Sequence, residues 1–331
     1  MTTYTGTKKC RPETFAPREG EDCSLNRKHI TLAMLFERQK CLLALVDSLG
    51  GDVGALDFQK LLFLYCREVE TTPSYEFVPY RFGGFSFTSY ADKRRLIEQG
   101  LLADEERCWK LTPAGRRVAT VPSMVRMRMD QFSKRHCKMR GDALVAEAYR
   151  RHPFHATRSE IAGRVLAGEE SALAAIKAAR PPAGVPGVCT IGYEGRSLEG
   201  YLNRLLHAGV TLLCDVRRNP LSRKYGFSKS TLSKACEGVG IKYEHLPELG
   251  IASDERQELN NQADYDALFA AYERESLPRQ TEALKKISAW VSAGERVALT
   301  CFEKLPEQCH RHCVADALAR TFGHKFAPQH L

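Results

Sequence analysis

The segment VALTCFEKLPEQCHRHC (residues 297–313) joins a strand-like run to a helix-like one. Its first four residues, VALT, are mostly apolar and include β-branched side chains, which is typical of a buried strand. They lead directly into Cys301 and Glu303, and a loop around Pro306 then reaches Cys309 at the start of an Ala- and Leu-rich pattern. Because ligands of parallel α/β sheets bind outside the carboxyl ends of the strands, reactive side chains at this junction indicate a functional site.

Strand-like and helix-like patterns alternate upstream of that segment. The strand-like runs cover residues 188–193, 211–217, 242–246 and 296–302. The helix-like runs cover residues 197–207, 229–239, 265–293 and 309–322. Regular alternation predicts an α/β fold, in which helices cover both faces of a parallel sheet in a Rossmann-like arrangement.

The N-terminal half of the chain shows a different order. Two helix-like patterns, a Gly83-Gly84 turn and a third helix-like pattern precede two short β runs, residues 101–102 and 108–111. This is the order of a winged helix-turn-helix, so we expect a mainly helical, winged-helix-like domain there. The sequence therefore predicts four segments: a flexible arm (1–30), a winged-helix-like domain (31–120), a basic helical connector with a Pro/Gly linker (121–186) and the α/β domain (187–331).

The charge of the chain favours an anionic partner. The 331 residues carry a formal charge of +9, and nucleic acid is the commonest partner of such a protein. The connector is densely basic, and we expect it to contact double-stranded DNA. A solvated helix face is the alternative, because runs of charge are usually that. The candidate DNA-binding residues are Arg126, Arg128, Lys134, Arg135, Lys138 and Arg140.

The apolar patterns and the cysteines indicate the cellular compartment in which we expect the protein. No apolar run approaches the length that spans a bilayer, and residues 1–15 lack the apolar core of a signal peptide. These patterns predict a cytoplasmic protein. The 12 cysteines are then expected to be free, buried, catalytic or metal-binding rather than paired in disulfides.

Four motifs follow one another across residues 188–322: TIGYEGRSLEGYL, DVRRNPLSRKYGFSK, HLPELG and CFEKLPEQCHR. Together they resemble domain-of-unknown-function family 488, in the order and spacing of that family. The resemblance implies no settled reaction. Residues 32–120, with DFQKLLFLY and VPYRFGGFS, are similar to the SocA-like (Panacea) antitoxin domain. That second resemblance implies DNA binding or protein recognition.

Polar side chains follow all four expected strands of the α/β domain. Because the carboxyl ends of parallel strands meet at one edge of a sheet, we expect a shared pocket there. The motif positions expected to line it are Tyr193, Glu194, Asp215, Arg217, Arg218, Asn219, Ser222, Arg223, Cys301, Glu303, Cys309, His310 and Arg311.

The residue types suggest roles within this pocket. Asp215 beside Arg217 would ionise readily and could act as a nucleophile or base, or it could only brace the loop through an ion pair. Glu194 and Glu303 would be its acid/base partners. Tyr193 would stack on a base or pack in the core. The expected phosphate or nucleotide ligands are Arg217, Arg218, Asn219, Ser222, Arg223, Arg311 and the helix N-cap Ser228.

The cysteines of residues 297–313 admit three interpretations. Cys309 in the first turn of a helix, beside His310, would have a lowered thiol pKa and could act as a nucleophile. It could instead pack at a tight strand–helix junction. The third interpretation is a zinc site, although the spacing lacks the paired CxxC arrangement that marks such sites. We therefore expect no metal and no cofactor. The zinc ligands, if present, would be Cys301, Cys309, His312 (or His310) and Cys313.

These patterns favour an enzyme that acts on a nucleotide or modified base, a hydrolase of the glycosylase type. Cleavage of an N-glycosidic bond needs a carboxylate and an activated water, and a base inside a duplex must first be flipped out. Such a DNA glycosylase would fit DNA repair or defence against foreign DNA, including phage DNA. The alternative is a non-catalytic, nucleotide-sensing DNA-binding regulator or antitoxin-like protein. Three carboxylates at one sheet edge favour the enzyme, because a phosphate sensor needs only arginines.

Overall fold

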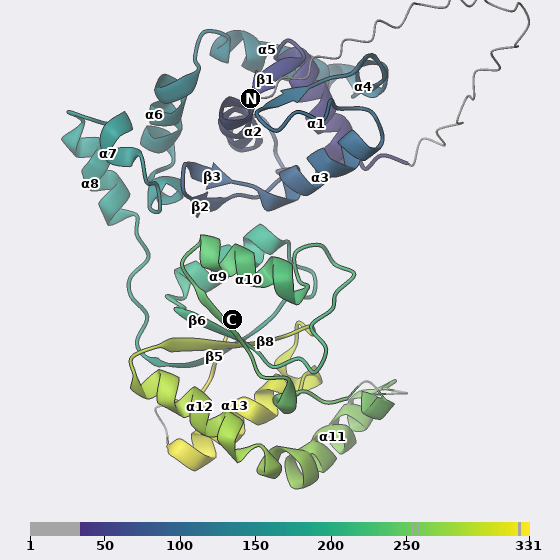
Figure 1. Cartoon of the computed structure of the whole chain (residues 1–331), viewed down its shortest axis with the longest axis vertical. Helices are drawn as coiled ribbons and strands as arrows, with labels where there is room; N and C mark the ends of the chain where they lie inside the picture. Colours follow the sequence, from purple (N-terminus) through teal and green to yellow (C-terminus); the bar gives the residue numbers. More distant parts are fainter. Residues whose placement is uncertain (1–33, 253, 257–258, 324–325) are drawn as a thin grey trace, which may run out of the picture. The chain divides into compact units, whose positions relative to one another are not determined.

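The computed structural model describes residues 34–252, 254–256, 259–323 and 326–331 (Figure 1). The arm expected at residues 1–30 lies outside these described residues. Within them, a mainly helical region is followed by an α/β domain, which confirms the α/β fold expected for the C-terminal part. The described residues contain no helix that is both long and apolar enough to cross a membrane.

The α/β domain is built on a five-stranded sheet with the order β7-β6-β8-β5-β9, in which all pairs are parallel. Its strands are β5 (Gly187–Gly192), β6 (Leu212–Asp215), β7 (Lys242–His245), β8 (Arg296–Cys301) and β9 (Gln329–His330). The first four confirm the strands expected from the apolar runs. β9 was not expected, because two residues are too short to give a periodic signal.

The register of the sheet brings four strand ends together. Asp215 at the end of β6 pairs with Thr300 of β8 and with His245 of β7. Gly192 at the end of β5 pairs with Cys301 at the end of β8. The residues that follow these strands therefore emerge at one edge of the sheet.

Helices cover both faces of this sheet, as the alternating pattern predicted (Figure 1). Ala298 of β8 faces a core with α9 (Leu198–His207) and α10 (Lys229–Gly238). Leu299, the next residue of β8, faces a separate core with α12 (Thr281–Ser292) and α13 (Arg311–Phe322). Successive strand residues point to opposite faces, which explains why β8 is apolar throughout.

Two of the expected helices differ from the structure. Residues 265–293 form α11 (Gln262–Ala271) and α12 with a π turn and a 3₁₀ turn between them, because Pro278 cannot donate a backbone hydrogen bond inside a helix. The last helix begins at Arg311 with His310 as its N-cap, not at Cys309. Cys309 is instead extended, with φ −143° and ψ 128°.

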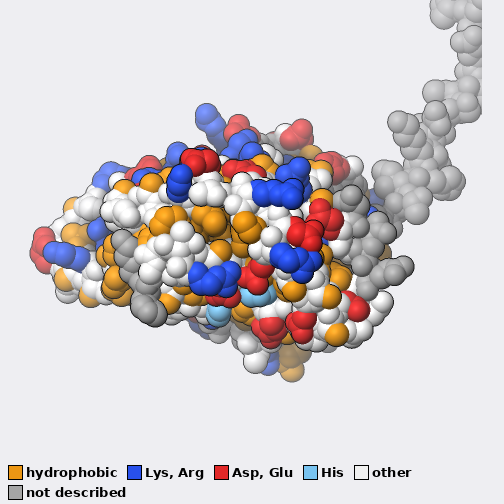
Figure 2. All heavy atoms as spheres, turned by 90° about the horizontal axis from the view of Figure 1, so that it is seen from below, with side chains coloured by type: hydrophobic (Ala, Val, Ile, Leu, Met, Phe, Trp, Pro, Cys, Tyr) orange, Lys and Arg blue, Asp and Glu red, His pale blue; other side chains and the backbone are white. Residues whose placement is uncertain are grey.

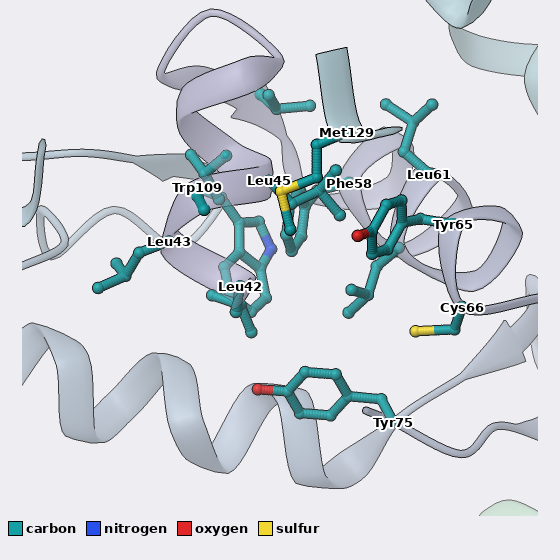
Figure 3. Packing of buried hydrophobic residues seen from close by; sticks show 14 of the residues in the cluster. Leu42, Leu43, Leu45, Phe58, Leu61, Tyr65, Cys66, Tyr75, Trp109 and Met129 are labelled. Carbon is teal, nitrogen blue, oxygen red and sulfur yellow. The ribbon is translucent and has the colours of Figure 1, made fainter. Parts of the chain in front are cut away.

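The helical region begins with a compact core. Its elements are α1 (Glu37–Ser48), β1 (Asp52–Gly54), α2 (Ala55–Glu68), β2 (Val78–Tyr80), β3 (Gly83–Phe85), α3 (Phe87–Glu98), β4 (Cys108–Lys110) and α4 (Pro113–Val118). β1 pairs antiparallel with β4, and β2 with β3. Between residues 101–102 and 108–111, only the Leu102–Leu111 bridge forms, since β4 pairs with β1 instead. Phe58 lies against Trp109 in the core, with ring centroids 4.4 Å apart (Figure 3).

Residues 121–186 contain α5 (Ser123–His136), α6 (Gly141–Arg151), a 3₁₀ turn (Pro153–Ala156), α7 (Ala162–Val165) and α8 (Glu170–Ala178). Met129 and Phe132 of α5 belong to the same core as Trp109. Val145 and Tyr149 of α6 belong to a smaller core with α7 and α8. The basic stretch is therefore made of packed helices.

Candidate functional site

A pocket of about 350 Å³ lies at the sheet edge where β5, β6 and β8 end. Its lining residues come from those strand ends, from the loop after β6, and from Ile251, Arg256 and His310. Nine residues predicted from the sequence line it: Tyr193, Arg217, Arg218, Asn219, Ser222, Arg223, Cys301, Glu303 and His310. Ile251, Leu221, Arg256 and Phe302 line it as well.

Asp215 does not line this pocket and is fully buried beneath it. Its two carboxylate oxygens accept hydrogen bonds from Arg217 Nε (2.8 Å) and Nη2 (2.5 Å), a bidentate ion pair. Tyr243 OH donates a further hydrogen bond to Asp215 Oδ2 at 2.6 Å. The remaining donor of the Arg217 guanidinium, Nη1, bonds Tyr193 OH (2.8 Å) and the carbonyl of Phe227 (2.9 Å). We call Asp215, Arg217, Tyr243 and Tyr193 the carboxylate cluster.

Ionisation in the carboxylate cluster follows from its burial and its charges. Burial opposes the charge on Arg217, but the bonds and charge of Asp215 outweigh this effect and raise its pKa. Burial, followed by the charge of Asp215, raises the pKa of Tyr243. The cluster therefore combines a permanent cation with a neutral phenol, and this arrangement matches the bracing role considered for Asp215.

Tyr193 is also occupied within the protein. Its ring stacks on Phe227, with centroids 4.3 Å apart and an interplanar angle of 8°, and the residue is 3% exposed. Phe302 meets Tyr193 edge-on at 5.3 Å but remains 43% exposed at the pocket. The aromatic surface available to a ligand is therefore Phe302, which we had not predicted.

Cys301, Cys309 and His310 form a second polar group at this edge, which we call the thiol cluster. The two Sγ atoms and one ring nitrogen of His310 all lie within 4.8 Å of one another, and all three residues are buried. Cys301 Sγ lies 3.8 Å from His310 Nδ1. The other ring nitrogen, Nε2, is 3.0 Å from the backbone carbonyl of Val216. The β8 end and the residues before α13 thus bring two thiols and one imidazole together.

The two thiols of this cluster differ in their ionisation. Burial alone would raise the pKa of the Cys309 thiol, but hydrogen bonds with Cys301 and His310 and the charges of His310 and Arg311 hold it well below its usual value. The hydrogen bond with Cys309, followed by burial, raises the pKa of Cys301 well above its usual value. The cluster by itself therefore favours one thiolate, on Cys309, and one thiol, on Cys301.

Glu303 connects the thiol cluster to the pocket. Cys301 Sγ donates to Glu303 Oε2 at 3.4 Å, and Arg256 forms an ion pair with the other carboxylate oxygen. The Glu303 side chain is 13% exposed, and burial raises its pKa. Among the predicted carboxylates, Glu303 is the one that lines the pocket.

Three other features hold the loop after β8 in place. Arg311, which is 1% exposed, donates to the carbonyls of Glu303 (2.6 Å) and Lys304 (3.0 Å) and does not line the pocket. Glu194 accepts a hydrogen bond from the Lys304 amide at 2.9 Å. A Cβ at Gly192 would lie 1.9 Å from the carbonyl oxygen of Glu303, so only glycine allows this approach. Arg311 and Glu194 therefore support the pocket from outside it.

The loop after β6 presents the pocket's exposed cations. Arg218 and Arg223 are exposed and line the pocket, and neither has an ion-pair partner among the residues that the structure describes. Ser228 is the N-cap residue of α10, as predicted, but its hydroxyl makes no capping bond. That hydroxyl instead donates to the carbonyl of Ser222 and accepts from its amide, both at 3.1 Å. Ser228 therefore shapes the loop and does not face the pocket.

The alternative zinc ligands His312 and Cys313 lie apart from the thiol cluster. His312 Nδ1 contacts the carbonyls of Pro306 and Cys309, at 3.0 and 2.8 Å, and its ring meets Phe269. Cys313 Sγ contacts His312. Within the described residues, His310 is the histidine that joins Cys301 and Cys309.

The candidate DNA-binding residues of α5 and its neighbours divide into two sets. Three are engaged within the protein: Arg126 with Asp47, Arg135 with Glu68, and Arg140 with the carbonyls of His136 and Met139. The other three are exposed and without an ion-pair partner in the described part of the chain: Arg128, Lys134 and Lys138. On the face drawn in Figure 2, Lys and Arg alternate with Asp and Glu among the described residues, so the positive charge is not gathered there.

Sequence comparison identifies one family. The family described as "Domain of unknown function DUF488" matches residues 197–318. No curated protein and no solved structure matches the chain. The match runs from the start of α9 into α13, includes the loop after β6 and the thiol cluster, and covers none of the helical region. The likeness of residues 32–120 to the SocA-like domain is not shown by these comparisons. Residues 197–318 of this chain form a DUF488 domain.

Proposed function

We propose that the chain is a DNA-associated enzyme that hydrolyses a bond of a nucleotide or modified base in the pocket at the β5–β6–β8 edge. The observation that carries the proposal is the pocket's composition. It combines two unpaired arginines, one exposed aromatic ring and one carboxylate within about 350 Å³. The arginines suit a phosphate, the aromatic ring suits a base, and the carboxylate suits proton transfer at the reacting bond.

Arg218 and Arg223 are the groups suited to phosphate. Their guanidinium donors have no carboxylate partner within the described residues, so an entering phosphate would not have to displace one. Arg217 is excluded from this role because its donors are occupied in the carboxylate cluster. Two phosphate ligands therefore remain from the predicted set of arginines.

Phe302 and Glu303 are suited to the base and to its chemistry. Phe302 offers an exposed ring on which a base can stack, which contributes about 1–3 kcal/mol per base in single-stranded sites. Glu303 follows it directly and can move a proton to or from the reacting group. We therefore keep for Glu303 the acid/base role that the sequence suggested for it, and we no longer assign the role of chief carboxylate to Asp215.

DNA association rests on the helical region. Helices α1, α2 and α3 with the β1–β4 pair occur in the order expected of a winged helix, and we retain that assignment as part of the proposal. The exposed Arg128, Lys134 and Lys138 would meet backbone phosphates. A base in a duplex would then be flipped into the pocket, as repair or defence against foreign DNA requires.

One observation favours a second candidate, a nucleotide-sensing regulator without catalysis. Asp215 is fully paired and Glu194 is bonded to a backbone amide, so a single predicted carboxylate lines the pocket. Glycosidic hydrolysis ordinarily uses two. A sensor would need only the arginines and Phe302.

Turnover of defined duplexes separates the two candidates. The full-length protein is incubated with duplexes that carry natural or modified bases, and mass spectrometry detects lost or altered bases. We expect Glu303→Gln to retain DNA binding and to lose about 100-fold or more in rate, the usual contribution of an acid/base group. Glu307→Gln is the matched control, because this exposed glutamate of the same loop lies outside the pocket. Binding of a nucleoside monophosphate without any product would support the sensor and overturn the enzyme.

A further inference from the structure

We propose that Cys301, Cys309 and His310 bind a zinc ion whose fourth coordination position opens into the pocket. This inference rests on the geometry of the thiol cluster alone. Only its chemical consequence, activation of a water molecule at the pocket, rests on the proposed function. The sequence offered zinc as one alternative, with four ligands that included Cys313, whereas the structure brings together Cys301, Cys309 and His310 without Cys313.

The distances in the thiol cluster fit a tetrahedral ion. Zinc binds thiolate sulfur at about 2.3 Å and imidazole nitrogen at about 2.0–2.1 Å, so a sulfur and a nitrogen ligand lie roughly 3.5 Å apart. Cys301 Sγ and His310 Nδ1 are 3.8 Å apart, and all three ligand atoms fall within 4.8 Å. Two thiolate ligands of such an ion lie roughly 3.8 Å apart, so a shift of at most about 1 Å brings the three atoms into coordination.

The hydrogen bond of His310 selects the nitrogen that faces the cysteines. A carbonyl oxygen can only accept, so the contact of Nε2 with Val216 O at 3.0 Å places the proton of the neutral imidazole on Nε2. Nδ1 is directed to Cys301 and is the ring nitrogen that a metal ion would bind, in place of the proton that it carries when His310 is charged. Metal-bound histidines characteristically donate their second nitrogen to a backbone carbonyl or a carboxylate in this way.

The ligand types and their burial favour zinc over other divalent cations. Two thiolates and one imidazole are soft or borderline ligands, which suit zinc and do not suit Mg²⁺ or Ca²⁺. Cys301, Cys309 and His310 are each at most 1% exposed. Two buried thiolates side by side would repel each other, and a divalent cation removes that cost.

The fourth position distinguishes a reactive site from a structural one. Structural zinc sites have four protein ligands, whereas sites that act on substrates keep three and an open position. No fourth Cys, His, Asp or Glu joins the group in the part of the chain described. Cys301 and His310 line the pocket, and Glu303 stands beside Cys301 at 3.4 Å. An ion here would face Glu303 and any ligand held by Arg218.

This arrangement supplies what the pocket otherwise lacks. A single carboxylate can move a proton, but hydrolysis also needs an activated water. A zinc-bound water loses its proton near neutral pH and would provide that nucleophile, with Glu303 beside it. For the proposed function, the consequence is a hydrolytic reaction at a nucleobase or at a glycosidic carbon.

Metal analysis of the full-length protein tests the site without any substrate. The protein is purified under reducing conditions without chelator, and its metals are measured by mass spectrometry. We expect one zinc per chain, lost in Cys309→Ser and in His310→Ala. Cys313→Ser and His312→Ala are matched controls that should keep it, since both residues lie outside the cluster. Circular dichroism checks that each variant is folded.

Cobalt substitution keeps the test decisive if a variant does not fold. The wild-type protein reconstituted with Co²⁺ should show the thiolate-to-cobalt absorption and the visible bands of a tetrahedral site. Absence of these bands, together with no stoichiometric binding of added Zn²⁺ by the reduced protein, would overturn the proposal. A Cys301–Cys309 disulfide that persists under the same reducing conditions would overturn it too. Failure of the duplex assay alone would leave the zinc result standing and reject only the proposed reaction.

Discussion

The carboxylate cluster and the thiol cluster lie at the same sheet edge, yet their bonding is opposite. In the carboxylate cluster, Asp215 accepts bonds from Arg217 and Tyr243, and Arg217 has no nitrogen without a partner. In the thiol cluster, two sulfurs and one imidazole nitrogen lie within 4.8 Å of one another, and sulfur takes part in each contact between them as a weak donor or acceptor. A satisfied buried network stabilises the fold, whereas an unsatisfied one is available for chemistry.

The largest effect should follow from breaking the carboxylate cluster. Asp215→Asn keeps the shape of the side chain but leaves the buried Arg217 cation without its counter-charge. Removal of one partner of a buried ion pair costs about 3–5 kcal/mol, so we expect the free energy of unfolding to fall by that amount. Urea titration followed by circular dichroism measures it. A loss below about 1 kcal/mol would mean that the pair is dispensable, contrary to this account.

Metal removal should affect the thiol cluster alone. A ligand at about 1,000 times its dissociation constant stabilises the folded state by about 4 kcal/mol, so chelation should lower the free energy of unfolding by up to this amount. Thermal unfolding with and without a zinc chelator measures the change. Cys313→Ser should still respond to the chelator and Cys309→Ser should not. Equal responses of both variants would argue against the assigned ligands.

The exposed arginines should affect ligand binding and leave stability unchanged. Each charge-assisted hydrogen bond contributes about 1.5–3 kcal/mol, so Arg218→Ala or Arg223→Ala should weaken binding of a nucleoside monophosphate by roughly 10- to 100-fold. Calorimetric titration measures this. Arg279→Ala is the control, because that exposed arginine does not line the pocket. Unchanged affinity in both pocket variants would remove the phosphate-binding role.

The smallest effect is expected at Tyr243. Tyr243→Phe removes one hydrogen bond to Asp215, and we expect a loss of about 1 kcal/mol near neutral pH. Because the folded state raises the pKa of Tyr243 above its ordinary value of 10.0, its contribution is complete below pH 10 and is lost as the pH rises further. The difference in unfolding free energy between wild type and variant should therefore shrink above pH 10. A difference that grows with pH would contradict this sign.

The sequence predicted the sheet edge better than the roles of its residues. Apolar runs locate β5, β6, β7 and β8, and parallel strands must end at one edge, so most of the pocket residues follow from the pattern. We expected Asp215 to be reactive because the sequence does not show which side chains donate hydrogen bonds to its carboxylate. The bond from Tyr243 depends on the pairing of β6 with β7, which no local pattern reveals.

The residues that were missed have equally physical explanations. Arg256 belongs to a short turn far from any strand end, and only the folded chain brings it to Glu303. Phe302 could have been found, since it lies between two predicted site residues, but an aromatic side chain after a strand usually indicates core. The sequence could not distinguish His310 from His312, because both lie close to the cysteines along the chain. The folded structure shows that His310 is the histidine beside Cys301 and Cys309.

A comparison of two single-turnover rates tests the contrast between the two clusters most directly. One is the rate of Glu303→Gln and the other is the rate of Tyr243→Phe. Both variants remove one interaction at the same sheet edge, but only Glu303 lines the pocket. On a duplex substrate, we expect a loss of about 100-fold or more for Glu303→Gln and of less than about 5-fold for Tyr243→Phe. A wild-type rate for Glu303→Gln, or a larger loss for Tyr243→Phe, would contradict this contrast.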